Sequence, residues 1–564
     1  MSRLSAVAPL LAAASGLTGL VAHPPVGWWP TTFLAPGLLV AALWVDALAA
    51  RRVGRGVRAF RLGALAGTVT FAPMLSWLIL PAGFLGWFLL VAVQVLWFGL
   101  LAVLLRPVLE HRLLPLAAAV VWTGVDAWRS LIPLNGFEWG AIAYAHVDGS
   151  WLLPVARLVG GRGITFLVVL ISVAAAIVVR VAARELAVGG VRNAEQALST
   201  TRWPLAWLVG GLLVSVLATV EPPEEIGTLD VLAVQGNDLR HWEDGVEDPD
   251  PPLRITTALR DETLAAVEED GAPQLTVWPE SSVDRDPWAE RGRPLGELAD
   301  EVAAEVGTLL TGATLDAPDD RSERYVAALL LQDGLHETDR YVKRRLVPFG
   351  EYIPFRPWLE WFPPLDQIPR DARSGSSPQT VEVADGVLAA VVICFETLFT
   401  DIVRTNVLAD DDPAQVVLTL TNDASFGDSA EPAQHLAQSR LRAVETGRWV
   451  VHAALSGSSA FVDPDGVAHQ ETAVFTVESI RAGVPLVEGL TPFLVTGDLV
   501  GTATRAASLL AVLLLPVGWW RQRRAGDGSA LSLPSGSEPG GGRHGGSPRH
   551  EEQRVGHRTR GTAR

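Results

Sequence analysis

Residues 387–396 read VLAAVVICFE, seven apolar residues followed directly by Cys394, Phe395 and Glu396. A short apolar run rich in valine predicts a strand that is buried on both faces of a sheet. Cys394 then stands where the strand ends, a common position for reactive groups in α/β folds. It is the only cysteine in the chain, which excludes an intramolecular disulfide and a cysteine-cluster metal site.

Further strands of the same kind lie on either side of this one. They are predicted at Thr228–Gln235, Gln274–Trp278, Thr308–Thr311, Val326–Gln332, Val416–Thr421, Trp449–Ala454 and Ser459–Val462. Segments with helical periodicity lie between several of them, at Arg254–Glu268, Leu295–Glu305 and Ala433–Thr446. This alternation predicts an α/β sandwich of roughly 270 residues, which is long enough to bury a core of its own.

The composition places another part of the chain in a bilayer. Of 564 residues, 49% are hydrophobic and only 19% are charged, and the mean hydropathy of +0.27 is high for a soluble enzyme. Apolar segments of membrane-spanning length recur at about 5–22, 28–50, 61–83, 85–105, 112–132, 163–181, 203–220 and 502–520. The net charge of −17 argues against a protein that binds nucleic acid through its phosphates.

Arginines mark alternate loops between these apolar segments. They cluster at residues 51–61, 106–112 and 180–202. The loops at 23–27 and near 84 carry no Lys or Arg, and the loop at 133–162 carries only Arg157 and Arg162. By the positive-inside rule, the amino terminus is cytoplasmic, the sandwich is extracytoplasmic and the last span returns the chain to the cytoplasm.

Four parts of the chain follow from these patterns. We expect a seven-span transmembrane domain at 1–221, an extracytoplasmic domain at 222–495, a closing transmembrane helix at 500–520 and a cytoplasmic tail at 521–564. The tail is rich in Gly, Ser, Pro and Arg, and this composition predicts disorder.

Two other polar residues stand out beside Cys394. Lys343 is the only lysine among 45 basic residues, and it lies in a segment shaped by two prolines and a glycine. Glu280 follows a predicted strand and the strand-ending Pro279. A thiol, a carboxylate and an ammonium could act as nucleophile, base and oxyanion partner. Taken singly, each is ordinary, because such residues are more often a core thiol, a solvated loop carboxylate and a surface lysine.

Three segments together resemble a known family. Trp278-Pro279-Glu280, the stretch Lys343–Pro354 and Cys394-Phe395-Glu396 are similar to the signature blocks of the nitrilase superfamily, in the form taken by the membrane-bound apolipoprotein N-acyltransferases. Further similarity to that branch lies in residues 234–237, 422–429 and 434–445. The blocks stand in the right order, with the only lysine and the only cysteine at the positions the family needs. The resemblance implies a polytopic helical membrane domain joined to a nitrilase-like α-β-β-α sandwich.

The resemblance also implies a reaction in which a fatty acyl chain passes from a membrane phospholipid to the α-amine of a diacylglyceryl apolipoprotein. Cys394 would form a thioester, Glu280 would be the base, and Lys343 would stabilise the oxyanion with the backbone N–H of Phe395. Glu351 and Glu396 match supporting acidic residues of the family. Neither a cofactor nor a metal is implied, and the location is the bacterial cell membrane.

Aromatic residues in predicted loops are candidates for contact with the lipid substrates. These are Trp242, Phe349 and Trp358. Ser425 stands where many relatives have tryptophan, so this chain has no aromatic side chain at that position. Two other functions fit the pattern. One is a membrane-tethered amidase that acts on a small C–N substrate, and the other is an inactive paralogue that binds lipoproteins.

Overall fold

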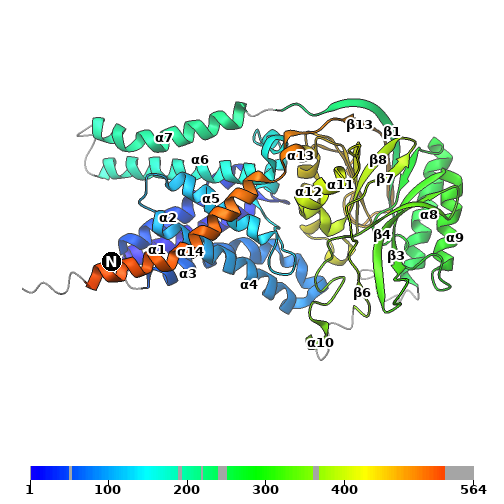
Figure 1. Ribbon diagram of the computed structural model, residues 1–564, viewed down its shortest axis with the longest axis horizontal. Coiled ribbons are helices and arrows are strands. Elements are labelled where there is room, and N and C mark those ends of the chain that lie inside the picture. The colour runs from blue at the N-terminus through cyan, green and yellow to red at the C-terminus, as the bar shows by residue number, and fades with distance from the viewer. Residues whose placement is uncertain are drawn as a thin grey trace, which may run out of the picture. The chain divides into compact units, whose positions relative to one another are not determined.

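The computed structural model describes residues 2–49, 54–187, 194–217, 220–238, 250–359 and 368–527. Trp242 and most of the expected tail lie outside these residues. The chain forms a helical region, residues 2–217, and an α/β region, residues 224–488, with a last long helix after it (Figure 1).

The helical region and the last helix account for the apolar segments of the sequence. Their long helices are α1 Ser2–Ala22, α2 Ala35–Ala49, α3 Arg55–Met74, α4 Ile79–Leu105, α5 Leu114–Arg129, α6 Ala156–Ala187, α7 Ala194–Leu217 and α14 Leu499–Asp527. Each predicted apolar segment overlaps one of these helices, with ends displaced by several residues. The segment 61–83 is the exception in its bounds, because it runs past the end of α3 into the first turn of α4. Among the described residues, three stretches are long and apolar enough to cross a membrane, Trp29–Leu48, Ser76–Val108 and Leu153–Glu185. The count of eight spans therefore stays a prediction.

Two mixed sheets form the α/β region. The first has the order β13-β1-β2-β3-β4-β5, with β6 beside β4. Its strands are β1 Glu224–Gln235, β2 Leu275–Val277, β3 Thr308–Asp316, β4 Glu323–Gln332, β5 His336–Val342, β6 Asp371–Ala372 and β13 Glu478–Glu488. The second sheet has the order β12-β11-β10-β9-β8-β7. Its strands are β7 Val381–Ala384, β8 Val387–Ile393, β9 Val416–Thr421, β10 Val450–Ala454, β11 Ala460–Val462 and β12 Ala468–His469.

Helices cover the outer face of each sheet. The helices of this region are α8 Pro251–Asp270, α9 Arg293–Val306, α10 Arg356–Leu359, α11 Thr400–Val407, α12 Glu431–Thr446 and α13 Pro492–Thr496. The side chains of β1 point alternately into two hydrophobic cores. Val231 packs between the two sheets, and Leu232 packs between the first sheet and helices α8 and α9. Helices α11 and α12 lie against the second sheet (Figure 1). The expected α-β-β-α sandwich is therefore present.

Some strands of the sandwich were not predicted from the sequence, or were predicted too short. Strands β5 and β13 form the two edges of the first sheet. The first five residues of β5, His336 to Arg340, are all polar, and β13 mixes polar and apolar residues. An edge strand faces solvent on one side and tolerates Pro485, so it lacks the continuous apolar run of a central strand. The expected strand Thr308–Thr311 was also too short, because β3 continues to Asp316.

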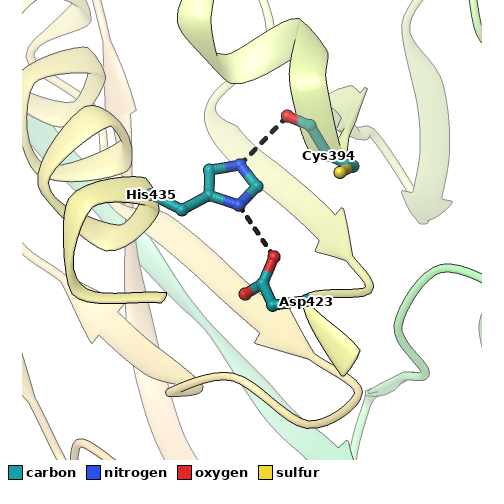
Figure 2. Close-up of side chains that lie close together, drawn as sticks. All are labelled: Cys394, Asp423 and His435. Carbon is teal, nitrogen blue, oxygen red and sulfur yellow. Dashed lines mark hydrogen bonds and ion pairs between the residues drawn. The ribbon is translucent and has the colours of Figure 1, made fainter. Parts of the chain in front are cut away.

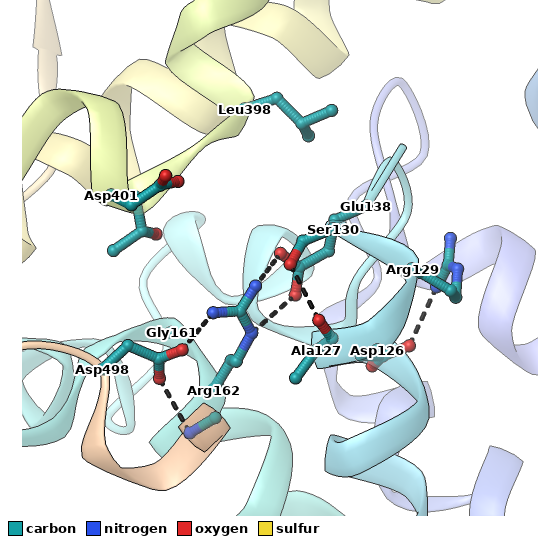
Figure 3. Close-up of polar contacts among 12 residues, drawn as sticks. Asp126, Ala127, Arg129, Ser130, Glu138, Gly161, Arg162, Leu398, Asp401 and Asp498 are labelled. Carbon is teal, nitrogen blue, oxygen red and sulfur yellow. Dashed lines mark hydrogen bonds and ion pairs between the residues drawn. The ribbon is translucent and has the colours of Figure 1, made fainter. Parts of the chain in front are cut away.

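A buried polar network joins α6 to the α/β region. Arg162 of α6 donates from Nε to Glu138 Oε1 at 3.0 Å and is also paired with Asp498, just before α14 (Figure 3). Glu445 of α12 accepts the backbone N–H of Gly161 at 2.7 Å. These contacts fix α12, and with it one face of the second sheet, to the start of α6.

Arg448 links both sheets from inside the α/β region. The side chain is fully buried, and its three nitrogens donate to the carbonyl oxygens of Ala414, Thr446 and Gly489 at 2.6, 2.6 and 2.9 Å. These carbonyls precede β9, end α12 and follow β13. Loss of the guanidinium would leave three buried acceptors without their donor.

We therefore expect Arg448→Met to lower the unfolding temperature of the protein in detergent. The cost should be about 3 kcal/mol or more, because buried acceptors stay unpaired. The exposed Arg321→Met is the matched control and should unfold near the temperature of the parent. Circular dichroism at one scan rate measures both, and equal unfolding temperatures for the two variants would contradict this role of Arg448.

Candidate active site

A buried ammonium group lies between two carboxylates at the ends of strands. Lys343 follows β5, and its Nζ lies 2.9 Å from Glu280 Oε1 and 2.7 Å from Glu351 Oε1. Lys343 is fully buried, and both glutamates are less than one-tenth exposed. An isolated charge in such a place would be very costly, so the two ion pairs are what makes the buried ammonium possible.

Glu280 reaches the lysine because its loop crosses β3 closely. The loop follows β2, and the N–H of Gly312 in β3 donates to the carbonyl oxygen of Pro279 at 3.2 Å. A side-chain carbon on Gly312 would lie 2.6 Å from the Cα of Glu280, which is too close for any other residue without a shift. Glycine at 312 therefore allows the approach that places the carboxylate beside Lys343.

Cys394 lies at a sharp turn from β8 into the short 3₁₀ helix Cys394–Leu398. Its φ is +48°, a left-handed conformation that is uncommon for a residue with a side chain. The cysteine is partly exposed, whereas Ile393 and Phe395 on either side are buried. Strained residues of this kind gather at functional sites, and here the strain falls on the only thiol of the chain.

Glu396 connects this turn to the backbone that directly follows Lys343. Its Oε1 accepts the backbone N–H groups of Arg344 and Arg345 at 2.7 and 3.0 Å, and its Oε2 accepts that of Ile393 at 2.9 Å. The Tyr341 hydroxyl donates to the same carboxylate at 2.9 Å. Because these bonds occupy the carboxylate, Glu396 positions the segments that carry Cys394 and Lys343.

The electrostatics favour a neutral thiol beside a charged pair. Burial raises the pKa of Cys394 well above its usual range, and Glu280 raises it further, against the opposing effect of Lys343. Burial also raises the pKa of Glu280, although Lys343 lowers it. Burial opposes the charge on Lys343, but Glu280 and Glu351 outweigh it and raise the lysine pKa well above normal. A neutral thiol needs a base before it can act as a nucleophile, and Glu280 is the charged neighbour that acts most strongly on this thiol.

Asp423 and His435 are further polar residues at this site that were not predicted to act there. His435 lies on α12, with Nδ1 3.0 Å from Asp423 Oδ1 and Nε2 3.1 Å from the carbonyl oxygen of Cys394 (Figure 2). Ligand atoms of these three residues lie within 4.8 Å of one another, a grouping that could hold a metal ion. Both ring nitrogens are, however, directed at protein oxygens. The expectation that the site uses no metal stays a prediction.

The aromatic candidates lie elsewhere. Phe349 and Trp358 lie on the segment after Lys343, on either side of the buried Glu351 and Ile353, and 46% and 81% of their own surfaces are accessible. Ser425 is exposed as well, and the neighbouring Phe426 instead packs its ring against Trp77, with centroids 4.9 Å apart. A substrate-binding role for Phe349, Trp358 and Trp242 stays a prediction.

Two separate parts of the chain match families of known proteins. Residues 15–174 match the family described as apolipoprotein N-acyltransferase N-terminal domain, and residues 239–481 match the carbon-nitrogen hydrolase family. The apolipoprotein N-acyltransferase of Ralstonia nicotianae is 30% identical over 93% of this chain and 95% of its own. That of Photobacterium profundum is 29% identical over 87% and 91%. Among solved structures, an amidase from Nesterenkonia sp. AN1 is similar at 17% identity over 48% of this chain and 96% of its own, with a TM-score of 0.33.

The raised pKa of Cys394 gives a direct expectation for its reactivity. Alkylation by iodoacetamide should be slow at pH 7.5 and should keep increasing with pH above about 8.5, the usual pKa of a thiol, because only the thiolate reacts. Mass spectrometry of the intact protein gives the rate without ambiguity, since the chain has one cysteine and Cys394→Ser provides the blank. A rate already constant below pH 7 would show that the resting enzyme holds a thiolate.

Proposed function

The chain belongs to the apolipoprotein N-acyltransferase family, and on this premise we propose that it moves a fatty acyl chain from a membrane phospholipid to an apolipoprotein. The acceptor is the α-amino group of the amino-terminal diacylglyceryl-cysteine, so the reaction completes lipoprotein maturation. The observation that carries the proposal is the only lysine of the chain, buried between Glu280 and Glu351, where the charge of Glu280 also acts on the only cysteine.

The first half-reaction forms an acyl-enzyme. Glu280 takes the thiol proton while Cys394 Sγ attacks the ester carbonyl carbon of the phospholipid. The tetrahedral oxyanion is stabilised by the Lys343 ammonium and the backbone N–H of Phe395. When the C–O bond breaks, the leaving alkoxide takes the proton from Glu280, and a lysophospholipid departs. Glu351 supports the ammonium throughout because it accepts from Nζ at 2.7 Å.

The second half-reaction transfers the acyl group. The acceptor amine attacks the thioester carbon and gives its proton to Glu280, the oxyanion forms in the same place, and the C–S bond breaks. The sulfur then takes a proton to become the neutral thiol of the resting site. Because the lysophospholipid leaves before the acceptor arrives, the two lipid substrates need not be bound together, and the kinetics are ping-pong.

The membrane architecture belongs to the same proposal. Residues 1–221 make a seven-span domain, residues 222–495 lie outside the cytoplasm, and residues 500–520 close the fold with an eighth span. The arginines at residues 51–61, 106–112 and 180–202 support this orientation, because cytoplasmic loops carry the basic residues. The exposed rings of Phe349 and Trp358 face solvent, where they could meet the outer leaflet or a lipid substrate.

Intact-mass analysis of the purified protein in detergent tests the acyl-enzyme. After incubation with phospholipid alone, the parent should gain one acyl mass that hydroxylamine removes and that an S-diacylglyceryl-cysteine peptide discharges. Cys394→Ser should gain none. Lys343→Arg should lose nearly all of the adduct, because the planar guanidinium cannot replace the compact ammonium between two carboxylates. Full adduct formation by either variant would contradict the assigned roles, and hydrolysis of a small amide without any lipid adduct would favour the amidase.

Cysteine labelling tests the orientation. In the Cys394→Ser background the chain has no thiol, so a cysteine added at Ser322 or Ser529 is the only target. A membrane-impermeant maleimide should label Ser322→Cys in intact spheroplasts, because that residue is exposed in the α/β region, and should label Ser529→Cys only after lysis. The opposite pattern would place the α/β region in the cytoplasm.

A further inference from the structure

The hydrogen bonds of His435 fix where its protons are. Nε2 lies 3.1 Å from the carbonyl oxygen of Cys394, and Nδ1 lies 3.0 Å from Asp423 Oδ1. A carbonyl oxygen has no hydrogen to give, so Nε2 must carry the hydrogen of the first bond. This holds whether the pair is an imidazolium with a carboxylate or a neutral imidazole with a protonated Asp423.

The surroundings of His435 keep that hydrogen in place. The ring is 1% exposed and lies between Asp423 and Glu431, whose Oε1 is 3.7 Å from Nδ1. Thr421 Oγ1 lies 3.2 Å from the same nitrogen, and the ring of His452 stands edge-on at 5.5 Å between centroids. Burial lowers the pKa of His435, but Asp423 outweighs it, so that the pKa is raised.

The carbonyl that His435 holds belongs to a peptide unit with a second function. The C=O of Cys394 and the N–H of Phe395 are the two ends of one planar peptide group and point in opposite directions. A donor on the oxygen fixes the plane of that group and polarises it, which makes the N–H at the other end a stronger donor. The effect matters here because Cys394 has φ +48°, a conformation that the surrounding structure must hold.

We propose that His435, oriented by Asp423, is a positioning residue that aims the Phe395 N–H at the oxyanion of both half-reactions (Figure 2). The inference rests on the function proposed above, because it assigns the oxyanion to that N–H. His435 does not touch the reacting atoms and acts only through the Cys394–Phe395 peptide.

Helix α12 ties this positioning to the helical region. Gln434, the residue before His435, accepts the indole N–H groups of Trp77 and Trp139 on Oε1 at 3.3 and 2.6 Å. Its Nε2 donates to the carbonyl oxygen of Pro24 at 3.2 Å. Consecutive residues of one helix thus bind the helical region and the peptide unit of the nucleophile. The alignment of the N–H therefore depends on the helices as well as on the sandwich.

Two variants of His435 separate a donor from a space-filling side chain. His435→Gln keeps an N–H that can reach the Cys394 carbonyl, whereas His435→Met keeps a similar volume and donates nothing. We expect His435→Met to slow acyl-enzyme formation about 10- to 100-fold, the loss typical of a buried hydrogen bond to a charged group, and His435→Gln to restore most of that rate. The loss should fall on kcat, with little change in the KM for phospholipid.

The matched control is His146→Met, which changes a fully buried histidine of the helical region in the same way. His146 lies within hydrogen-bonding distance of Thr32 and Ser150 and not of the Cys394 turn, so its loss should leave the acylation rate of the folded protein near that of the parent. The circular dichroism spectra of all variants should match that of the parent, which shows that the fold has survived. Equal rates for His435→Met and His435→Gln, or an equal loss in His146→Met, would overturn the proposal.

A second acyl donor keeps this test independent of the proposed substrate. If the parent forms no adduct with phospholipid, that result counts against the acyltransferase function alone. The same variants are then compared with p-nitrophenyl octanoate, because any acyl transfer to Cys394 builds an oxyanion at the same place. The order parent, His435→Gln, His435→Met is expected again, and the absence of that order would contradict the role of His435.

Discussion

The buried ammonium of Lys343 is the constraint on which the rest of the site depends. A charged amine without solvent is tolerated only if carboxylates surround it, so Glu280 and Glu351 must both be brought within 2.9 Å. Burial, and after it the charge of Glu280, raises the pKa of the nearby Cys394 well above its usual range, against the opposing effect of Lys343. The cluster therefore disfavours a preformed thiolate, and it places a carboxylate near the only thiol of the chain.

Two sets of hydrogen bonds hold Cys394 in place relative to this charge cluster. Glu396 accepts the backbone N–H groups of Ile393, Arg344 and Arg345, and so joins the end of β8 to the segment after Lys343. His435 of α12 binds the carbonyl oxygen of Cys394 itself. Helix α12 is also hydrogen-bonded to the helical region through Glu445 and Gln434. The position of Cys394 therefore depends on both the sandwich and the helical region.

The sequence predicted those strands whose apolar pattern is contained in one short segment. The central strands β8 and β9 were predicted at their observed bounds because both faces are buried and the apolar run is continuous. The edge strands β5 and β13 were missed because one side of each faces solvent. Glu280 and Cys394 stood out by their places after predicted strands, and Lys343 and Cys394 stood out as the only residues of their types. The bonds of His435 depend on how α12 packs, which no spacing in the sequence reveals.

The charge of Lys343 can be measured directly because the chain has one lysine. Labelling with [ε-¹³C]lysine gives a single side-chain signal in the NMR spectrum of the detergent-solubilised protein, and its chemical shift reports whether the amine is protonated. The account predicts an ammonium that persists above a pH of about 10.4, where an ordinary lysine is half-titrated, and that loses its proton at lower pH in Glu351→Gln. A signal that shows a neutral amine at pH 8 in the parent would contradict the central claim.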